Sequence, residues 1–281
     1  MPAKVYATAP RSRESLSARI RNLAPEHRTT EFRLRGTIGN IVIGQMLPSG
    51  AVKGGTAMAL RHGQSRTRFS PDVDVTRAGE VGVDEYVAEF RTNLQQGWHG
   101  FAGVIVAREP ATPAGVPSAY VMAPFNVKLS YQGKAWFTIL FELGHEEINS
   151  LASAPRVLAP DIADLFHALG LPTPAPVAVL PVDHQIAQKL HACSTPGSDR
   201  AHDLVDLQLL AGDPALDLAL TAATTRRLFA ARKRHLWPPV LTVSRGWAPR
   251  YHEAADGIAV LPTVAEAVVW VNGFISSLDG R

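Results

Sequence analysis

The sequence predicts an α/β (α+β) protein with a mixed sheet domain and flanking helices, followed by a mostly helical C-terminal domain. Between residues 101 and 144, apolar residues recur with period two in runs separated by Pro- and Gly-containing turns, which is the pattern of a sheet. Before and after this region, apolar residues recur every three or four positions, as in amphipathic helices. We therefore expect one domain over residues 1–155 and a second over 156–281, joined by a Pro- and Ala-rich junction at 154–182.

The first domain is predicted to begin with two helices and to continue with strands. Pro25 ends the first helix, and Thr29 or Thr30 caps the second through its side-chain oxygen. A short helix is expected to start at Thr56. The remaining predicted helices are Ser12–Leu23, a segment ending near Leu47, and Val83–Gln96, and the predicted strands are Phe69–Thr76, Phe101–Ala107, Ser118–Pro124, Asn126–Tyr131 and Ala135–Gly144.

The second domain is predicted to contain helices of different character. One helix within the junction is enclosed by prolines, and the last helix is apolar nearly all round, so we expect it to pack inside the helical domain. The predicted helices are Pro160–Leu169, Val182–Cys193, Asp199–Leu210, Ala215–His235 and Pro262–Leu278.

Composition favours a folded protein of the reducing cytoplasm. The 281 residues are 46% hydrophobic, enough for a full core, and no N-terminal apolar region or long apolar run indicates secretion or a membrane span. The single cysteine, Cys193, excludes an internal disulfide and a cysteine zinc cluster. Because it lies in an apolar-periodic helix, we interpret it as a packed thiol rather than a nucleophile.

Positive charge is clustered although the formal net charge is only +3. Such clusters suit phosphate-rich partners, and each taken singly is equally typical of a solvated helix face. A basic helix end followed by Trp237 could grip an RNA backbone and stack on a base. The clusters are Arg11, Arg13, Arg19 and Arg21, then Arg61, Arg66, Arg68 and Arg77, and last Arg226, Arg227, Arg232, Lys233 and Arg234.

A glycine-rich turn and an acidic pair lie close together in the sequence. Val52-Lys53-Gly54-Gly55-Thr56 reads as an element that turns into a helix, where glycines let backbone N–H groups approach an anion such as phosphate. Asp72 and Asp74 are two apart on a predicted strand and so share a face, while Val73 and Val75 face the core. Two adjacent carboxylates repel each other unless a cation such as Mg²⁺ neutralises them.

Alone, the glycine pair is more often a simple turn and the acidic pair is more often solvated charge. Together, the two motifs indicate a site for a metal-bound triphosphate. It is neither a P-loop nor a dinucleotide-binding fingerprint, because neither glycine spacing is present. Lys53-Gly54-Gly55-Thr56-Ala57 followed by Arg68-Phe69-Ser70-Pro71-Asp72-Val73-Asp74 resembles the first motif of the AbiEii/AbiGii-type nucleotidyltransferase toxins, the MenT-like group of the DNA polymerase β-like superfamily.

This resemblance implies specific roles for the motif. The aspartates Asp72 and Asp74 would bind Mg²⁺, or Mn²⁺ in its place, and the triphosphate of an NTP would lie on the glycine turn. The resemblance assigns nucleotide binding to Lys53, Gly54, Gly55, Thr56 and Ser70.

Glu142 is the candidate for a third acid of the site. It interrupts the apolar run Phe137–Leu143 of a predicted strand, and related nucleotidyltransferases carry a third acid on a neighbouring strand. That acid completes the metal site or activates the attacking hydroxyl. The alternative is a glutamate that faces water near the strand end.

A second block in the C-terminal half also resembles the family. Gln188-Lys189-Leu190-His191-Ala192 matches a Lys-Leu-x-Ala helix, and His202-Asp203-Leu204-Val205-Asp206-Leu207 matches a basic-acidic helix with His202 in place of the usual arginine. A lysine can stabilise charge on phosphate oxygens. The resemblance implies this role for Lys189, with Asp203, or alternatively Asp206, holding Lys189 or orienting the acceptor. His184, Gln188 and His191 share a helix face but do not indicate a metal site.

Taken together, the resemblance implies a Mg-dependent nucleotidyltransferase toxin that moves NMP from an NTP to an acceptor and releases pyrophosphate. It implies a tRNA acceptor and a cognate antitoxin as partners. Two alternatives stay open: an enzyme that nucleotidylates protein, and a non-catalytic nucleic-acid-binding module.

Overall fold

A computed structural model describes residues 5–110 and 121–281 of the chain. The chain forms two compact units. The first comprises Met1–Ser65, Phe69–Glu146 and Ala154–Val179, and the second comprises Arg66–Arg68, Glu147–Ser153 and Leu180–Arg281. The junction segment up to Val179 therefore belongs to the first unit, and the main division lies at residues 179/180 rather than at 155/156. In the described ranges, no helix has the length and apolar character needed to cross a membrane.

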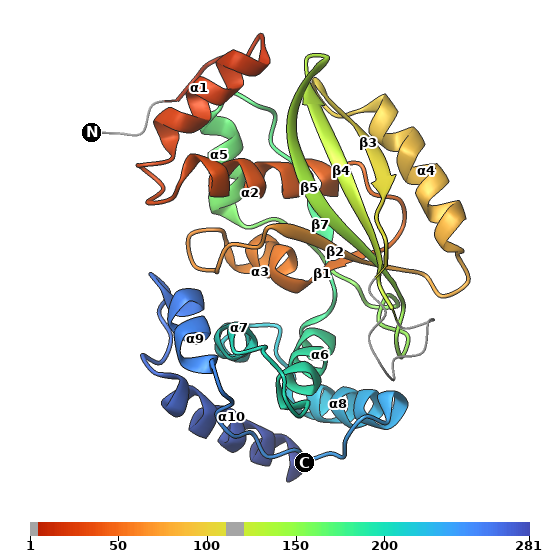
Figure 1. The fold of residues 1–281 in the computed structure, drawn as a ribbon, viewed down its shortest axis with the longest axis vertical. Coiled ribbons are helices and arrows are strands. Elements are labelled where there is room, and N and C mark those ends of the chain that lie inside the picture. The colour runs from red at the N-terminus through yellow and green to blue at the C-terminus, as the bar shows by residue number, and fades with distance from the viewer. Residues whose placement is uncertain (1–4, 111–120) are drawn as a thin grey trace. The chain divides into compact units, whose positions relative to one another are not determined.

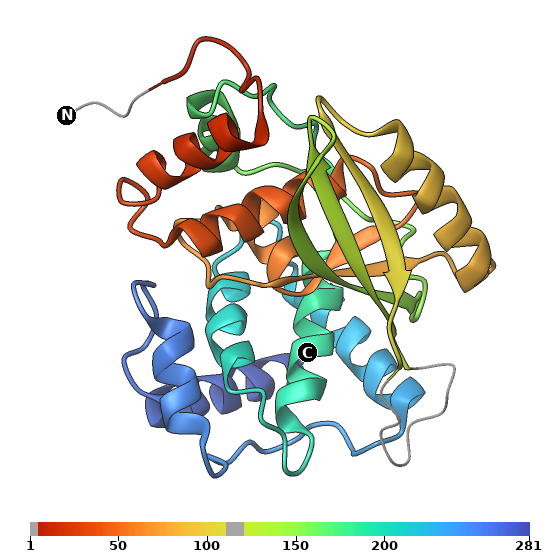
Figure 2. The same ribbon diagram turned by 45° about the horizontal axis from the view of Figure 1, so that its top comes forward.

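The first unit is built on a five-stranded mixed sheet with the strand order β1-β2-β5-β4-β3 (Figure 1). Strands β2 and β5 pair in parallel, and the other neighbours pair antiparallel. The twist of β3, β4 and β5 is plain when the molecule is turned, as in Figure 2. The strands are β1 (Ala51–Lys53), β2 (Asp72–Arg77), β3 (Phe101–Ala107), β4 (Ala123–Tyr131) and β5 (Lys134–His145), and a separate two-stranded sheet joins β6 (Arg156–Val157) to β7 (Val177–Ala178).

Two of the predicted strands differ from the observed ones for local reasons. Strand β2 begins at Asp72 and not at Phe69, because the preceding Pro71 has no N–H to donate to a ladder. Strand β4 is continuous from Ala123 to Tyr131, where the sequence predicted two strands, and the predicted residues 118–120 lie outside the described ranges. The sequence did not predict the small β6–β7 sheet.

The helices of the first unit agree closely with the sequence prediction. Ser12 caps α1 by accepting a hydrogen bond from the Ser15 N–H, and Thr30, not Thr29, caps α2. Helix α4 packs along the edge strand β3, as Figure 1 shows. These helices are α1 (Arg13–Leu23), α2 (Glu31–Gly44), α3 (Gly54–His62), α4 (Val83–Gln96) and α5 (Pro160–Ala168).

The second unit is helical apart from its loops. Helix α6 packs on α7 and α8, and α10 packs on α7, α8 and α9. Asp217 caps α8, and Lys233, with a φ of 51°, ends it in the left-handed region, so this helix is shorter than predicted. The helices are α6 (Val182–Ser194), α7 (His202–Ala211), α8 (Leu218–Arg232), α9 (Trp247–Ala255) and α10 (Val264–Asp279).

Two predictions for the second unit were wrong. Helix α10 is not buried on all sides, because Val269 is 73% exposed while Val268 and Val271 face the interior. Helix α7 begins at His202 rather than at Asp199. Helix α9 was not predicted from the sequence, although its buried residues Trp247 and Tyr251 lie four positions apart on one helical face.

Asn40 of α2 connects three elements around the glycine turn. Its side chain is only 4% exposed, and its Nδ2 lies 3.0 Å from Thr56 Oγ1 and 3.0 Å from the carbonyl oxygen of Ser70. The same nitrogen lies 3.3 Å from the carbonyl oxygen of Asp72. The Thr56 hydroxyl in turn donates to that Asp72 carbonyl at 2.7 Å. The start of α3 is thereby fixed to the start of β2.

We expect Asn40→Ala to lower the free energy of unfolding by about 1–3 kcal/mol, because two carbonyl oxygens and a hydroxyl lose a buried donor. Urea unfolding followed by circular dichroism measures this change. Asn22→Ala, at an exposed asparagine of α1, is the control and should change stability by less than about 0.5 kcal/mol. Equal unfolding midpoints for Asn40→Ala and the wild type would contradict the connecting role of Asn40.

Candidate active site

The glycine turn and the acidic strand meet at Gly54 and Asp74. Strand β1 pairs antiparallel with β2 so that Lys53 lies opposite Asp74. Gly54 follows with a φ of 65°, a conformation that residues with a Cβ rarely adopt. A Cβ built at this position would overlap the Oδ2 atom of Asp74. Only glycine therefore lets the turn lie directly against this carboxylate.

Helix α3 begins immediately after this contact. Gly54, Gly55 and Thr56 are its first three residues, so their N–H groups have no acceptor within the helix. The N-cap residue, Lys53, makes no side-chain capping bond. A helix N-terminus of this kind attracts phosphate through its N–H groups and its dipole. The Thr56 hydroxyl, by contrast, bonds Asp72 and Asn40, so this side chain belongs to the scaffold.

The acidic pair lies on strand β2 as the alternation of the sequence predicts. Val73 and Val75 are fully buried, whereas Asp72 and Asp74 are half-buried on the opposite face. The Ser70 hydroxyl donates a 2.6 Å hydrogen bond to Asp72 Oδ1. Ser70 therefore orients the first carboxylate.

Glu142 lies beside the acidic pair. In the parallel pairing of β2 with β5, Glu142 is opposite Asp74 and Leu140 is opposite Asp72, so all four side chains share one face of the sheet. On this face Leu140, Val106 and Val104 are 39%, 42% and 50% exposed. The carboxylates therefore lie on the face of the sheet that carries partly exposed side chains.

The donor set suits a hard cation. In residues 5–110 and 121–281, no three or more His, Cys, Asp or Glu side chains are arranged as a complete metal site. Mg²⁺ is usually bound by one or two carboxylates, with substrate phosphates and water completing its coordination. Asp72 and Asp74 supply such a pair of oxygen ligands next to a phosphate-binding turn. These residues fit Mg²⁺, and Glu142 is near enough in the sheet to assist them.

In the second unit, Lys189 lies in a buried ionic network. Its Nζ is 3.0 Å from Asp203 Oδ1 and 2.6 Å from Asp206 Oδ2, and both carboxylates are fully buried. Arg68 binds Asp206 through two nitrogens, at 3.1 Å and 2.9 Å, and Arg200 Nε lies 2.8 Å from Asp203 Oδ2. Both aspartates of this block, and not one of them, hold Lys189.

The network keeps both aspartates ionised. Burial alone would raise the pKa of Asp203, but Lys189 and Arg200 outweigh burial and hold this pKa well below its usual range. Burial opposes ionisation of Asp206 in the same way, and Lys189 and Arg68 lower its pKa. The sequence placed Arg68 in a basic cluster and in the first motif, but it did not predict that Arg68 and Arg200 pair with these aspartates. Their positions four residues before Asp72 and three before Asp203 carry no signal of this pairing.

Two further side chains of α6, those of His191 and Cys193, pack in the interior of the second unit. Burial lowers the pKa of His191 to about 3, with Arg232 and His235 adding to the effect, so this imidazole is neutral at physiological pH. Cys193 is buried and its Sγ lies 3.5 Å from the Leu190 carbonyl oxygen. Burial raises the pKa of the Cys193 thiol, which agrees with a packed thiol.

A helix N-terminus beside two strand carboxylates is an arrangement that suits a metal-bound nucleotide. The profile of the family described as "Nucleotidyl transferase AbiEii toxin, Type IV TA system" matches residues 44–264. The chain belongs to this family of nucleotidyltransferase toxins of toxin–antitoxin systems.

One solved structure gives an independent comparison of the fold. MenT4, a nucleotidyltransferase toxin from Mycobacterium tuberculosis, superposes with a TM-score of 0.60 at 16% sequence identity, covering 94% of this chain and 90% of MenT4. At this identity the likeness concerns the fold. No curated protein sequence matches the chain significantly.

We expect Gly54→Ala to reduce nucleotidyl transfer by roughly 100-fold or more, because the added methyl group displaces the Asp74 carboxylate, and misplacement by about 1 Å at a reacting centre has effects of this size. Gly133→Ala is the matched control. Gly133 also has a positive φ, 73°, but a Cβ there meets no atom within 4 Å. Initial rates of label transfer measure the effect. If Gly54→Ala and Gly133→Ala reduced the transfer rate equally, the loss would come from backbone strain and not from displacement of the Asp74 carboxylate.

We expect Lys189→Met to lower the free energy of unfolding by about 3–5 kcal/mol at neutral pH, because it leaves buried carboxylates with less compensation. In the wild type the lowered aspartate pKa values stabilise the folded state above about pH 4 and this contribution falls on acidification. In the variant the carboxylate pKa values rise, so protonation relieves the penalty as the pH falls.

The difference in stability between wild type and Lys189→Met should therefore be largest at about pH 7 and smaller at about pH 4.5. Urea unfolding at both pH values measures it. Lys134→Met, at a lysine whose side chain is 65% exposed, is the control and should show no such difference. A gap that is constant with pH would mean that lost packing, and not charge, causes the destabilisation.

Proposed function

We propose that this toxin catalyses Mg²⁺-dependent transfer of NMP from an NTP to the 3′ end of an RNA, with tRNA as the acceptor. The hydroxyl oxygen of the acceptor forms a bond to the α-phosphorus and loses its proton. The bond from the α-phosphorus to the bridging oxygen breaks, and pyrophosphate leaves.

The observation that carries this proposal is the direct approach of the Gly54 backbone to the Asp74 carboxylate. This approach places a helix N-terminus, which can bind an anion, directly beside a carboxylate, which can bind a cation. A metal-bound triphosphate requires both groups next to each other. When bound, Mg²⁺ would offset the negative charge on the phosphate oxygens.

Residues of the first unit would bind the phosphates, hold the cation and accept the proton. Gly54, Gly55 and Thr56 would offer backbone N–H groups to the phosphates, and Lys53 adds a positive charge at the same turn. Asp72 and Asp74 would hold the cation. Glu142, opposite Asp74 on the same face, is placed to accept the proton of the attacking hydroxyl or to complete the metal site.

We assign Lys189 to charge stabilisation on the phosphates, with Asp203 and Asp206 as positioning residues. The two carboxylates fix the ammonium group through contacts of 3.0 Å and 2.6 Å. A lysine held in this way loses little conformational freedom when it binds an anion.

Charge supports the proposed acceptor, and family membership supports the antitoxin partner. RNA is favoured over protein because arginines are clustered and the sequence pI is about 9.2. Membership of a toxin–antitoxin family indicates a cognate antitoxin. We propose that the toxin acts in the cytoplasm, where NTP and tRNA are available.

The test is incubation of purified protein with Mg²⁺, each α-³²P-labelled NTP in turn, and total tRNA. We expect label on tRNA with the wild type and a loss of roughly 100-fold or more with Asp74→Asn, which keeps the shape of the side chain and removes its charge. Omission of Mg²⁺ should have the same effect as the substitution.

The same assay separates the alternatives. Label on cellular protein and not on RNA would identify a protein-nucleotidylating enzyme. Absence of label on either acceptor with every NTP would contradict the transferase proposal and favour a nucleic-acid-binding module.

A further inference from the structure

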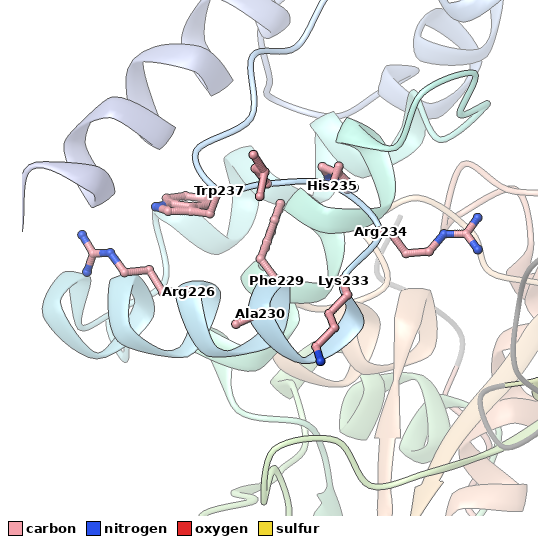
Figure 3. A pocket seen from close by; sticks show the side chains of 8 residues that line it. Arg226, Phe229, Ala230, Lys233, Arg234, His235 and Trp237 are labelled. Atoms are coloured by element: carbon pink, nitrogen blue, oxygen red, sulfur yellow. The ribbon is translucent and has the colours of Figure 1, made fainter.

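The second unit contains a pocket of about 560 Å³ at the end of α8, in the range of small-ligand sites. It lies between the last turns of this helix and the chain that returns from it, as Figure 3 shows. None of the eight residues that line it is acidic. Neither the Asp72–Asp74 carboxylates nor the Lys189 network contributes to the lining.

Aromatic side chains form the wall of this pocket. Phe229 and Trp237 are in edge-to-face contact with centroids 5.2 Å apart, and His235 packs on Phe229 at 5.0 Å. The Trp237 Nε1–H donates a 2.9 Å hydrogen bond to Asp279 Oδ1, which fixes the indole orientation. Phe229 is almost fully buried, whereas Trp237 is only half-buried and presents part of its ring to the pocket.

Three cations surround this aromatic wall. Arg226 donates to the carbonyl oxygens of Leu278 and Asp279 at the end of α10, so its guanidinium is fixed near the indole. Lys233 and Arg234 are exposed and follow the helix end. Figure 3 shows both side chains directed away from the Phe229–Trp237 pair. In this view Arg226 lies on one side of the Phe229–Trp237 pair and Lys233 and Arg234 lie on the other, so cationic groups are present on both sides of the aromatic wall.

The imidazole of His235 is neutral, so Arg226, Lys233 and Arg234 supply the positive charge of the pocket. Burial lowers the pKa of His235, and Arg234 lowers it further. Its Nε2 lies 2.7 Å from Ser194 Oγ, which fixes the ring. The combination of a flat aromatic surface with cations on both sides of it matches a ligand with an unstacked base and phosphates on each side.

We propose that this pocket binds single-stranded RNA, with one base stacked on Trp237 and the flanking phosphates held by Lys233 and Arg234. The choice of RNA rests on the proposed function. An acidic peptide would satisfy the cations but would leave the aromatic wall without a planar partner.

The test measures binding in the absence of NTP, by fluorescence anisotropy of a fluorescein-labelled single-stranded oligoadenylate with the full-length protein. We expect Trp237→Ala to weaken binding about 5- to 150-fold with an unchanged salt dependence, because it removes stacking only. We expect Lys233→Glu to weaken binding and to reduce the slope of log K against log salt by about 0.7 or more, because it removes a phosphate contact.

Two matched variants and a melting curve complete the design. Lys134→Glu, the same charge change at an exposed lysine of the first unit, should leave affinity and salt slope close to the wild-type values. Trp237→Phe, which keeps a stacking ring, should retain most of the affinity. Thermal unfolding by circular dichroism shows whether Trp237→Ala remains folded, and Lys233→Glu, at an exposed position, tests the proposal independently.

Several outcomes would overturn the proposal. Binding of oligoadenylate by Lys233→Glu and Trp237→Ala that is no weaker than binding by Lys134→Glu would be one such outcome. Tighter binding of single-stranded DNA of the same sequence, or of labelled polyglutamate that depends on Trp237, would assign the pocket to a different ligand. Label transfer to tRNA with wild-type rates in both variants and unchanged binding would refute the pocket and leave the transferase intact. RNA binding that depends on Trp237 and Lys233, without any label transfer, would support the pocket and refute the transferase proposal.

Discussion

The hydroxyl of Thr56 is the contact on which the geometry of the catalytic unit depends. It accepts from Asn40 and donates to the carbonyl of Asp72, so one oxygen atom joins α2, the first turn of α3 and the first residue of β2. Because the helix N-terminus and the acidic strand share this anchor, they keep their relative position. The close approach of Gly54 to Asp74 follows from it.

The two units differ in whether their clustered carboxylates are paired with cationic side chains. In the first, Asp72, Asp74 and Glu142 gather on one face of the sheet, where like charges favour capture of a cation. In the second, three cations surround the two aspartates that hold Lys189, so that network is already compensated and carries an excess of positive charge. The first arrangement concentrates negative charge on one face of the sheet, and the second concentrates positive charge around two buried carboxylates.

The sequence was sufficient where a local rule decides the structure. Alternation along residues 69–76 correctly placed Val73 and Val75 in the core and the aspartates on the other face. Helix α4 and strand β3 have the predicted bounds because periodicity and flanking glycines define them. The family resemblance was confirmed by the match over residues 44–264.

The sequence was insufficient where distant residues meet. Asn40 reads as one polar position in an apolar helix, and nothing nearby indicates that its amide reaches residues 16 to 32 positions away. The pairing of Arg68 with Asp206 spans 138 residues and depends on tertiary packing alone. Helix α9 was missed because its N-cap residue Gly246 and its third residue Pro249 are turn formers, and burial of Trp247 and Tyr251 outweighs that preference.

The assignment of Arg66–Arg68 to the second unit makes the chain discontinuous in both units. The backbone leaves the first unit after Ser65, contributes Arg68 to the network around Asp206, and re-enters the first unit at Phe69. A fragment that starts at residue 180 would therefore bury the Asp206 carboxylate without one of its two cationic partners. Neither unit corresponds to a contiguous stretch that can be separated by a single cut, and recombination between related toxins would have to exchange this three-residue segment together with the C-terminal helices.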